Sequence, residues 1–226
     1  TLAGLINSGR VLGKDLKDLR VLVNGVGAAG SSIIRLLHLY GVRNIIACSK
    51  DGALYPGMEG MDPVQAEIAK AINPQGRQGN LKDLIEEQDV FVGVSVAKVE
   101  QGNADVPVID MERAKAAGAK IVASGRSDFP NQVNNVLGFP GIFRGALDVR
   151  AIAINEAMKI AAAEAIANLI DPSELRPDYV IPRPFDPRVV PAVAVAVGLA
   201  AVETGVARIV LTEDELRAKV VGSICR

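Results

Sequence analysis

The fold is decided by the stretch Arg20-Val21-Leu22-Val23-Asn24-Gly25-Val26-Gly27-Ala28-Ala29-Gly30, an apolar run that enters a G-x-G-x-x-G motif. The residues that follow carry apolar side chains at Ile33, Ile34 and Leu37, which is the spacing of an amphipathic helix. A strand that leads into a glycine turn and then a helix is the context in which this motif predicts dinucleotide binding. Without a ligand, the same pattern would only be a tight strand-to-helix turn.

Each glycine of the motif has its own physical role. Gly25 permits the tight turn, Gly27 lets a pyrophosphate approach the backbone, and Gly30 lets the helix pack close to the strand. The pyrophosphate would lie at the N-terminus of the helix, where free N–H groups and the helix dipole favour an anion. The expected cofactor-binding turn consists of Gly25, Val26, Gly27, Ala28, Ala29 and Gly30.

The hydrophobic pattern along the chain predicts an α/β fold. Strands over 20–24 and 44–48, joined by a helix over 28–40, form a βαβ unit whose strands should be parallel. We expect a Rossmann-type, doubly wound, mostly parallel sheet with helices on both faces. Further strands are predicted over 90–95 and 120–124, further helices over 2–13, 63–71, 81–88, 111–117, 151–169 and 191–204, and an extended proline-rich segment over 175–187.

Composition and charge exclude several classes of protein. The chain has 25 basic and 26 acidic residues, so neither a nucleic-acid nor a membrane-surface partner is expected. Its longest apolar run, residues 189–202, is interrupted by Pro and Gly and is shorter than the about 20 residues that span a bilayer. Cys48 and Cys225 do not form a disulfide framework, which favours a reducing, cytoplasmic location. With a single histidine the chain offers no His-based metal cluster, and the place of His38 inside the helix predicted over 28–40, away from the glycine turn, favours a packing or surface role over a Ser-His-Asp triad.

The end of the second predicted strand bears on the choice of cofactor. Ser49, Lys50 and Asp51 follow Gly30 by about 20 residues, where a dinucleotide's adenosine ribose is expected. Ser49 and Lys50 suit the 2′-phosphate of NADP, whereas Asp51 could accept a hydrogen bond from the ribose 2′-hydroxyl of NAD. The sequence therefore leaves both cofactors open, and a solvated turn is the alternative for all three residues.

Polar or small residues also end two later predicted strands. Gly93, Val94 and Ser95 close the third strand, at the sheet edge where ligands bind in open α/β folds. The polar run 125–135 follows the fourth and contains three Asn residues, whose amides both donate and accept hydrogen bonds. Such a run suits carboxylates, hydroxyls and a carboxamide but supplies no acid, base or nucleophile.

These stretches together resemble the NAD(P)-binding half of bacterial-type malic enzymes, which oxidatively decarboxylate malate to pyruvate and carbon dioxide. The match is carried by Asn24–Gly30, by Val92–Ser95, by Ser124–Asn135 running on through Phe139–Asp148, and by Ile181-Pro182 with Phe185–Val189. The third stretch is long and highly specific. The resemblance covers essentially the whole chain, 1–226, as one NAD(P)-binding domain.

The resemblance implies a role for each matching position. Asn134 and Asn135 match an Asn pair that reaches malate and the nicotinamide, and Gly25–Gly30 match the pyrophosphate loop. Family members use NAD or NADP and a divalent metal, Mg or Mn, act on malate and release pyruvate, and form homodimers or larger homo-oligomers. Their general base Lys, general acid Tyr and metal carboxylates belong to an N-terminal half. We therefore expect no catalytic or metal-binding residue in this chain, and no activity from the chain in isolation.

Some features depart from the family pattern. The segment 97–110 lacks the family's Ala-Asn-Pro turn, of which Asn103–Pro107 could be a remnant; either the turn is deleted or the numbering closes over a missing loop. The start at Thr1, without Met, indicates a fragment or a processed product. Two other hypotheses remain: a non-catalytic dinucleotide-binding and dimerising module, and the cofactor domain of a related amino-acid dehydrogenase. The run 125–148 argues against the second of these.

Overall fold

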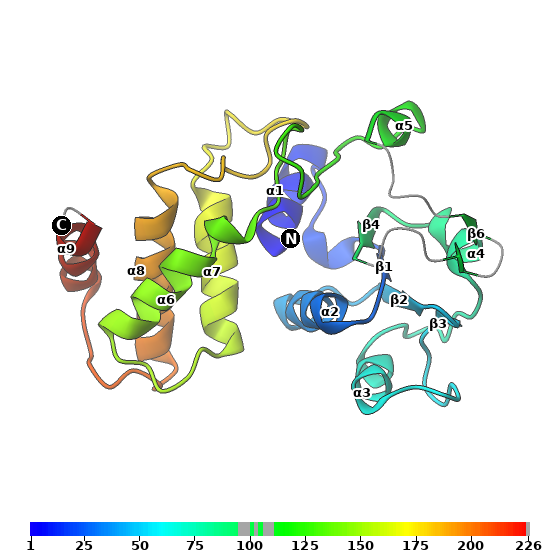
Figure 1. The fold of residues 1–226 in the computed structure, drawn as a ribbon, viewed down its shortest axis with the longest axis horizontal. Coiled ribbons are helices and arrows are strands. Elements are labelled where there is room, and N and C mark those ends of the chain that lie inside the picture. The colour runs from blue at the N-terminus through cyan, green and yellow to red at the C-terminus, as the bar shows by residue number, and fades with distance from the viewer. Residues whose placement is uncertain (95–99, 102–103, 106–110, 225–226) are drawn as a thin grey trace. The chain divides into compact units, whose positions relative to one another are not determined.

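The computed structural model describes residues 1–94, 100–101, 104–105 and 111–224 (Figure 1). The chain is organised as two compact units. We call Lys14–Ala119 the sheet unit, and Thr1–Gly13 with Lys120–Arg226 the helical unit. That residues 1–226 act as one NAD(P)-binding domain stays a prediction.

The sheet unit is built on four strands in the order β3-β2-β1-β4, which can be followed in Figure 1. The central strand β1 is parallel to both neighbours, with Val21 opposite Ile45 on one side and Val90 on the other. The short β3 is antiparallel to β2. The elements of this unit are η1 (Leu16–Asp18), β1 (Val21–Asn24), α2 (Ala28–Tyr40), β2 (Ile45–Ser49), β3 (Gly52–Ala53), α3 (Pro63–Ala71), α4 (Leu81–Ile85), β4 (Val90–Gly93), β5 (Glu100–Gln101), β6 (Ala104–Asp105) and α5 (Met111–Ala116).

Both faces of this sheet are covered because the chain winds in two directions from β1. Leu22 packs in one cluster with Leu81 and Leu84 of α4. Val21 and Val23 point to the opposite face, since side chains alternate along a strand, and they are fully buried as well. Helix α2 connects β1 to β2 and contacts both strands. The predicted mostly parallel Rossmann-type sheet is confirmed.

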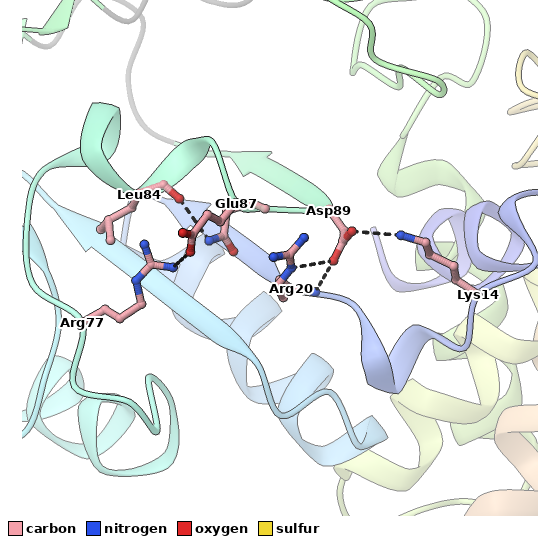
Figure 2. A network of polar contacts seen from close by, with 7 residues as sticks. Lys14, Arg20, Arg77, Leu84, Glu87 and Asp89 are labelled. Carbon is pink, nitrogen blue, oxygen red and sulfur yellow. Dashed lines mark hydrogen bonds and ion pairs between the residues drawn. The ribbon is translucent and has the colours of Figure 1, made fainter.

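The carboxylate of Asp89 links the residues that precede two neighbouring strands of the sheet (Figure 2). It accepts hydrogen bonds from the Arg20 backbone N–H at 3.0 Å, from Arg20 Nε at 3.1 Å and from Lys14 Nζ at 3.0 Å. Arg20 lies directly before β1 and Asp89 directly before β4, so one side chain joins the entrances of two neighbouring strands. These hydrogen bonds, those from Arg20 first, hold the pKa of Asp89 well below its usual range.

The helical unit is centred on α8, which packs against α6, α7 and α9. Figure 1 shows α6, α7 and α8 side by side, with α9 beyond α8. Helix α6 approaches α8 closely because Gly145 has no side chain: a Cβ there would lie 2.3 Å from the Ala194 carbonyl oxygen. The helices of this unit are α1 (Leu2–Leu12), η2 (Asn135–Leu137), α6 (Phe139–Asp148), α7 (Glu156–Asn168), α8 (Val189–Glu203) and α9 (Glu213–Ile224).

Most predicted elements are confirmed, and one is wrong. Residues 120–124 do not form a strand; Ser124 makes only an isolated bridge to Gln132. This segment belongs to the helical unit, and the backbone of Ser124 bonds to the loop that follows it. The helix predicted over 151–169 begins only at Glu156, because Asn155 caps it by accepting from the Met158 N–H at 3.0 Å. Helix α6 was not predicted, since its Pro and two Gly residues disfavour a helix in isolation.

Replacing Asp89 by Asn should lower the free energy of unfolding of the sheet unit by about 1–2 kcal/mol at pH 7, because charged hydrogen bonds are lost. The pKa of Asp89 is depressed by folding, so its contribution is complete above the carboxyl's unfolded pKa of about 4 and fades as the pH falls below it. Urea unfolding at several pH values should therefore show the gap between wild type and Asp89→Asn narrowing from pH 5 to pH 2.

The control for this measurement is Glu67→Gln. Glu67 pairs with Arg35 at 2.7 Å, but both side chains are largely exposed. Removing that pair should change stability little at any pH. A gap for Asp89→Asn that stays constant with pH would show that the carboxylate's charge is not what stabilises the unit.

Candidate cofactor and substrate site

The glycine turn joins β1 to α2 by a backbone that excludes side chains at two positions. Gly25 has a φ of +108°, a conformation that other residues rarely adopt, and its N–H donates to the Cys48 carbonyl at 2.9 Å. A Cβ at Gly30 would lie 1.8 Å from the Gly25 carbonyl oxygen. The fold itself therefore accounts for both glycines, whether or not a ligand binds.

Gly27 differs from its two neighbours in the motif. Its φ of −76° suits any residue, and a Cβ added there would meet no described atom within 4 Å. Neither backbone strain nor packing within the described structure requires glycine at this position. Glycine here leaves open space directly in front of the α2 N-terminus, which is the space that a pyrophosphate needs.

The first turn of α2 is open to an anion. Gly27, Ala28 and Ala29 are exposed, whereas Val26 and Gly30 are buried. No side chain among the described residues caps the helix at Gly27. The first N–H groups of a helix have no partner within it, and together with the helix dipole they attract negative charge. The residues present thus fit the diphosphate of a dinucleotide.

The end of β4 lies against this turn. Gly93 pairs with Asn24, and the Val94 N–H donates to the Asn24 carbonyl at 2.9 Å. Val94 Cγ2 lies 3.2 Å from the position that a Cβ at Gly30 would occupy. The chain leaves β1 for β2 on one side and reaches β4 on the other, which is the switch point where ligands bind in such sheets. Ser95, predicted with these residues, lies outside the described part of the chain.

Ser49, Lys50 and Asp51 lie in the tight connection between β2 and β3. The Ser49 hydroxyl accepts from the Asp51 N–H at 3.1 Å and lies 3.4 Å from the Gly52 carbonyl, so it is used within the turn. Lys50 and Asp51 are exposed, one residue and two residues beyond the carboxyl end of β2. The turn therefore presents a cation and an anion to a ligand at this edge.

Asn134 and Asn135 are adjacent in the helical unit, in the turn that precedes α6. Asn134 is half-buried, and its Oδ1 accepts from the Val136 N–H at 3.0 Å, which caps η2. The cap uses Oδ1, and the Nδ2 hydrogens are the donors that this amide can offer to a ligand oxygen. Asn135 is exposed beside it. The structure brings these two amides together, in the unit that does not contain the glycine turn.

The polar loop also carries a charged pair that the sequence analysis did not single out. Arg126 contacts the Asp128 carboxylate through two hydrogen bonds, at 3.0 and 2.6 Å, and its guanidinium lies 4.8 Å from the Phe129 ring centroid. The hydrogen bond from Arg126 lowers the pKa of Asp128. The signal in the sequence was an Arg and an Asp two residues apart, a spacing common on exposed turns.

Few of the described residues are candidates for metal ligands or for nucleophiles. Within residues 1–94, 100–101, 104–105 and 111–224, no three His, Cys, Asp or Glu side chains gather as metal ligands would. Cys48 is fully buried, and burial raises the pKa of its thiol to about 11, so it stays protonated at neutral pH. The described helices are also too short or too polar to cross a membrane.

Comparison with known proteins points to one family. Residues 116–204 match the family model "Malic enzyme, NAD binding domain". The bifunctional malic/malolactic enzyme of Bacillus subtilis is 54% identical over 97% of this chain and 57% of its own length. The NAD-dependent malic enzyme of Geobacillus stearothermophilus is 45% identical over 92% of this chain and 46% of its own length. The NADP-dependent malic enzyme of Escherichia coli is 38% identical over 91% and 31%.

Solved structures agree with these sequence matches. The malic enzyme of Entamoeba histolytica has a TM-score of 0.89 at 32% identity and covers 99% of this chain, which spans 51% of that protein. The malic enzyme of Pyrococcus horikoshii has a TM-score of 0.88 at 35% identity over 99% of this chain and 57% of its own. The chain therefore spans about half the length of the first relatives it matches.

Two substitutions separate the glycine that the fold needs from the glycine that leaves space for a ligand. Gly30→Ala forces a methyl group into the Gly25 carbonyl and should destabilise the protein by about 1–3 kcal/mol or prevent folding. Gly27→Ala places its methyl group in open space and should leave the melting temperature of the ligand-free chain unchanged. Thermal unfolding followed by circular dichroism compares the two. Equal destabilisation by both would contradict this division of roles.

Proposed function

Because the chain belongs to the malic enzyme family, we propose that it is the part of such an enzyme that holds NAD or NADP while malate is oxidised and decarboxylated to pyruvate and carbon dioxide. The observation that carries this proposal is the space at Gly27. The fold explains Gly25 and Gly30 without a ligand, whereas the absent side chain at Gly27 is explained by a group that binds against the backbone.

In the proposed complex, the diphosphate lies against the exposed N–H groups of Gly27, Ala28 and Ala29. Gly93 and Val94 would then border the cofactor, because β4 ends beside the glycine turn. The bound nicotinamide supplies the acceptor for the hydride that leaves malate. The role of these residues is to fix the cofactor's position and to exclude side chains from its path.

Asn134 and Asn135 are proposed to orient the substrate. The Nδ2 donors of Asn134 suit a carboxylate or hydroxyl oxygen of malate or a carboxylate of pyruvate, and the helix cap at its Oδ1 holds the amide in place. We propose that the general base, the general acid and the Mg or Mn ligands lie outside the described residues, in the part of malic enzymes that this chain does not span. The isolated chain would then bind cofactor without turning over malate.

The choice between the cofactors is proposed to depend on Lys50 and Asp51. The relatives include both an NAD-dependent and an NADP-dependent malic enzyme. Lys50 is exposed just beyond the carboxyl end of β2, which supports a contact with a 2′-phosphate, and Asp51, one residue on, could accept from an unphosphorylated ribose. Ser49 is less suited to either contact than the sequence suggested, since its hydroxyl already stabilises the turn.

We also propose a homodimer or larger homo-oligomer in the cytoplasm. An apolar stripe supports a protein contact on the helical unit: Phe139, Phe143 and Leu147 of α6 are 64%, 45% and 67% exposed. They lie four residues apart, on the side of α6 away from the glycines that pack against α8. Burial of Cys48 as a free thiol is consistent with a reducing compartment.

A binding titration tests the cofactor proposal on the chain itself. Gly27→Val should abolish binding of both NAD and NADP to a folded protein, because the side chain fills the diphosphate space. Lys50→Ala should weaken NADP by about tenfold and leave NAD unchanged, since only NADP carries the phosphate. Isothermal titration calorimetry measures both. The matched controls are Gly222→Val, at another glycine with open space around its Cβ position, and Lys82→Ala, at an exposed lysine of α4.

Equal loss of both nucleotides in Lys50→Ala would contradict the assignment of the 2′-phosphate. If wild-type chain that is folded by circular dichroism binds neither nucleotide, the proposed function itself fails.

The substrate proposal needs the rest of an enzyme. We expect the chain, joined to the unmatched part of the Bacillus subtilis relative, to reduce NAD or NADP in the presence of malate and Mn, and to stop when the metal is removed by EDTA. Asn134→Ala and Asn135→Ala should each raise the KM for malate about tenfold with little change in the KM for cofactor. Cofactor binding without turnover in a folded fusion would favour the non-catalytic module instead.

A further inference from the structure

Asn131 joins the polar loop to a separate segment of the helical unit. Its side chain is buried, with 6% exposure. The Nδ2 group donates to the Val122 carbonyl at 3.1 Å and to the Pro177 carbonyl at 2.9 Å, while Oδ1 accepts from the Val180 N–H at 2.8 Å. Both amide hydrogens and the acceptor are therefore in use, so only one orientation of the side chain satisfies all three partners.

The backbone at Asn131 is held in an uncommon conformation. Its φ is +56°, in the left-handed region that Asn tolerates better than most residues. Its carbonyl accepts from the Ser124 N–H at 3.3 Å, so the backbone is fixed as well as the side chain. A left-handed residue persists where its surroundings hold it, and here three hydrogen bonds of the side chain do so.

The two residues between Asn131 and Asn134 are themselves held by hydrogen bonds. The Val133 N–H donates to the Ser124 carbonyl at 2.7 Å, and Gln132 Nε2 donates to the Gly125 carbonyl at 3.3 Å. Asn134 follows directly and caps η2 through the Val136 N–H. Hydrogen bonds thus tie Asn131 to the 177–180 segment, and the backbone leads from it through two hydrogen-bonded residues to the two amides.

We infer that Asn131 is a positioning residue for Asn134 and Asn135: its buried side chain anchors the polar loop to Pro177 and Val180 and so sets where the two amides lie. The inference rests on the proposed function in one respect only, namely that these amides contact malate. The anchoring itself is a property of the chain and can be measured without any ligand.

Asn73 in the sheet unit provides a matched control. It has a φ of +54° and 3% exposure, its Nδ2 donates to the Leu54 and Arg77 carbonyls at 2.9 and 2.8 Å, and its Oδ1 accepts from the Arg77 N–H at 2.9 Å. Backbone conformation, burial and hydrogen-bond count therefore match those of Asn131. The partners of Asn73 lie in its own unit, 4 and 19 residues away along the chain, so Asn73→Gly should show what loss of such a side chain does to stability without touching the polar loop.

The experiment compares Asn131→Gly with Asn73→Gly by NMR on the whole 226-residue chain. Glycine keeps the left-handed backbone and removes the side chain. In Asn131→Gly, the side-chain amide signals of Asn134 and Asn135 should shift or broaden, and hydrogen exchange at the Val136 N–H should accelerate at least about tenfold. In Asn73→Gly these signals should stay as in the wild type. Asn131→Asp, which keeps the acceptor for Val180 and loses both donors, gives the same comparison if Asn131→Gly does not fold.

In the fusion enzyme, Asn131→Asp should raise the KM for malate several-fold and leave the KM for cofactor unchanged, whereas Asn73→Gly should leave the KM for malate unchanged. The inference is overturned if exchange accelerates at Val180 but Val136 and both amide signals stay unchanged, because Asn131 would then stabilise only its immediate neighbours. It is also overturned if both glycine variants disturb the amides equally. A loop response without any malate turnover would leave the anchoring intact and count against the proposed function instead.

Discussion

The close approach of α2 to the end of β1 is the constraint on which the sheet unit depends. With 1.8 Å between the Gly25 carbonyl oxygen and the position of a Cβ at Gly30, no side chain fits between the helix and the turn. This contact directs the α2 N-terminus along the carboxyl edge of the sheet, where β4 also ends. An open helix N-terminus and two strand ends meet there, so the geometry that lets the fold pack also creates a place for an anion.

In the helical unit, glycines also allow two elements to pack closely, but here both elements are helices. Gly141 and Gly145 let α6 lie against α8, and the buried carboxylate of Asp148 at the end of α6 pairs with Arg144. Lys219 of α9 donates to the Asp148 carbonyl at 2.8 Å, which ties the last helix to the same place. A buried charge is costly unless it is paired, and here the pairing fixes how α6 ends. Since α6 begins at Phe139, just after the η2 turn that Asn134 caps, this packing also supports the turn that carries the two amides.

The two units differ in the chemistry that each offers to a ligand. The sheet unit offers backbone N–H groups and open space, and both suit a diphosphate. The helical unit offers side-chain amides and a charged pair on a loop that is held by buried hydrogen bonds. The chain spans about half the length of the first relatives it matches.

The sequence by itself determined the βαβ unit, the glycine turn and most of the helices. Each of these depends on local patterns, namely apolar spacing, glycines at fixed offsets and capping residues. Residues 120–124 show the limit of predicting structure from such patterns. They form an apolar run, but a run becomes a strand only if a neighbouring strand bonds with it. Helix α6 shows the reverse, because its glycines are unfavourable locally and are used only when α8 lies against them. Only the tertiary structure decided that Gly27 is free of packing demands, that the Ser49 hydroxyl is already engaged, and that Asn131 bonds to residues 46 and 49 positions further along the chain. Long-range contacts of this kind leave no periodic signal in the sequence.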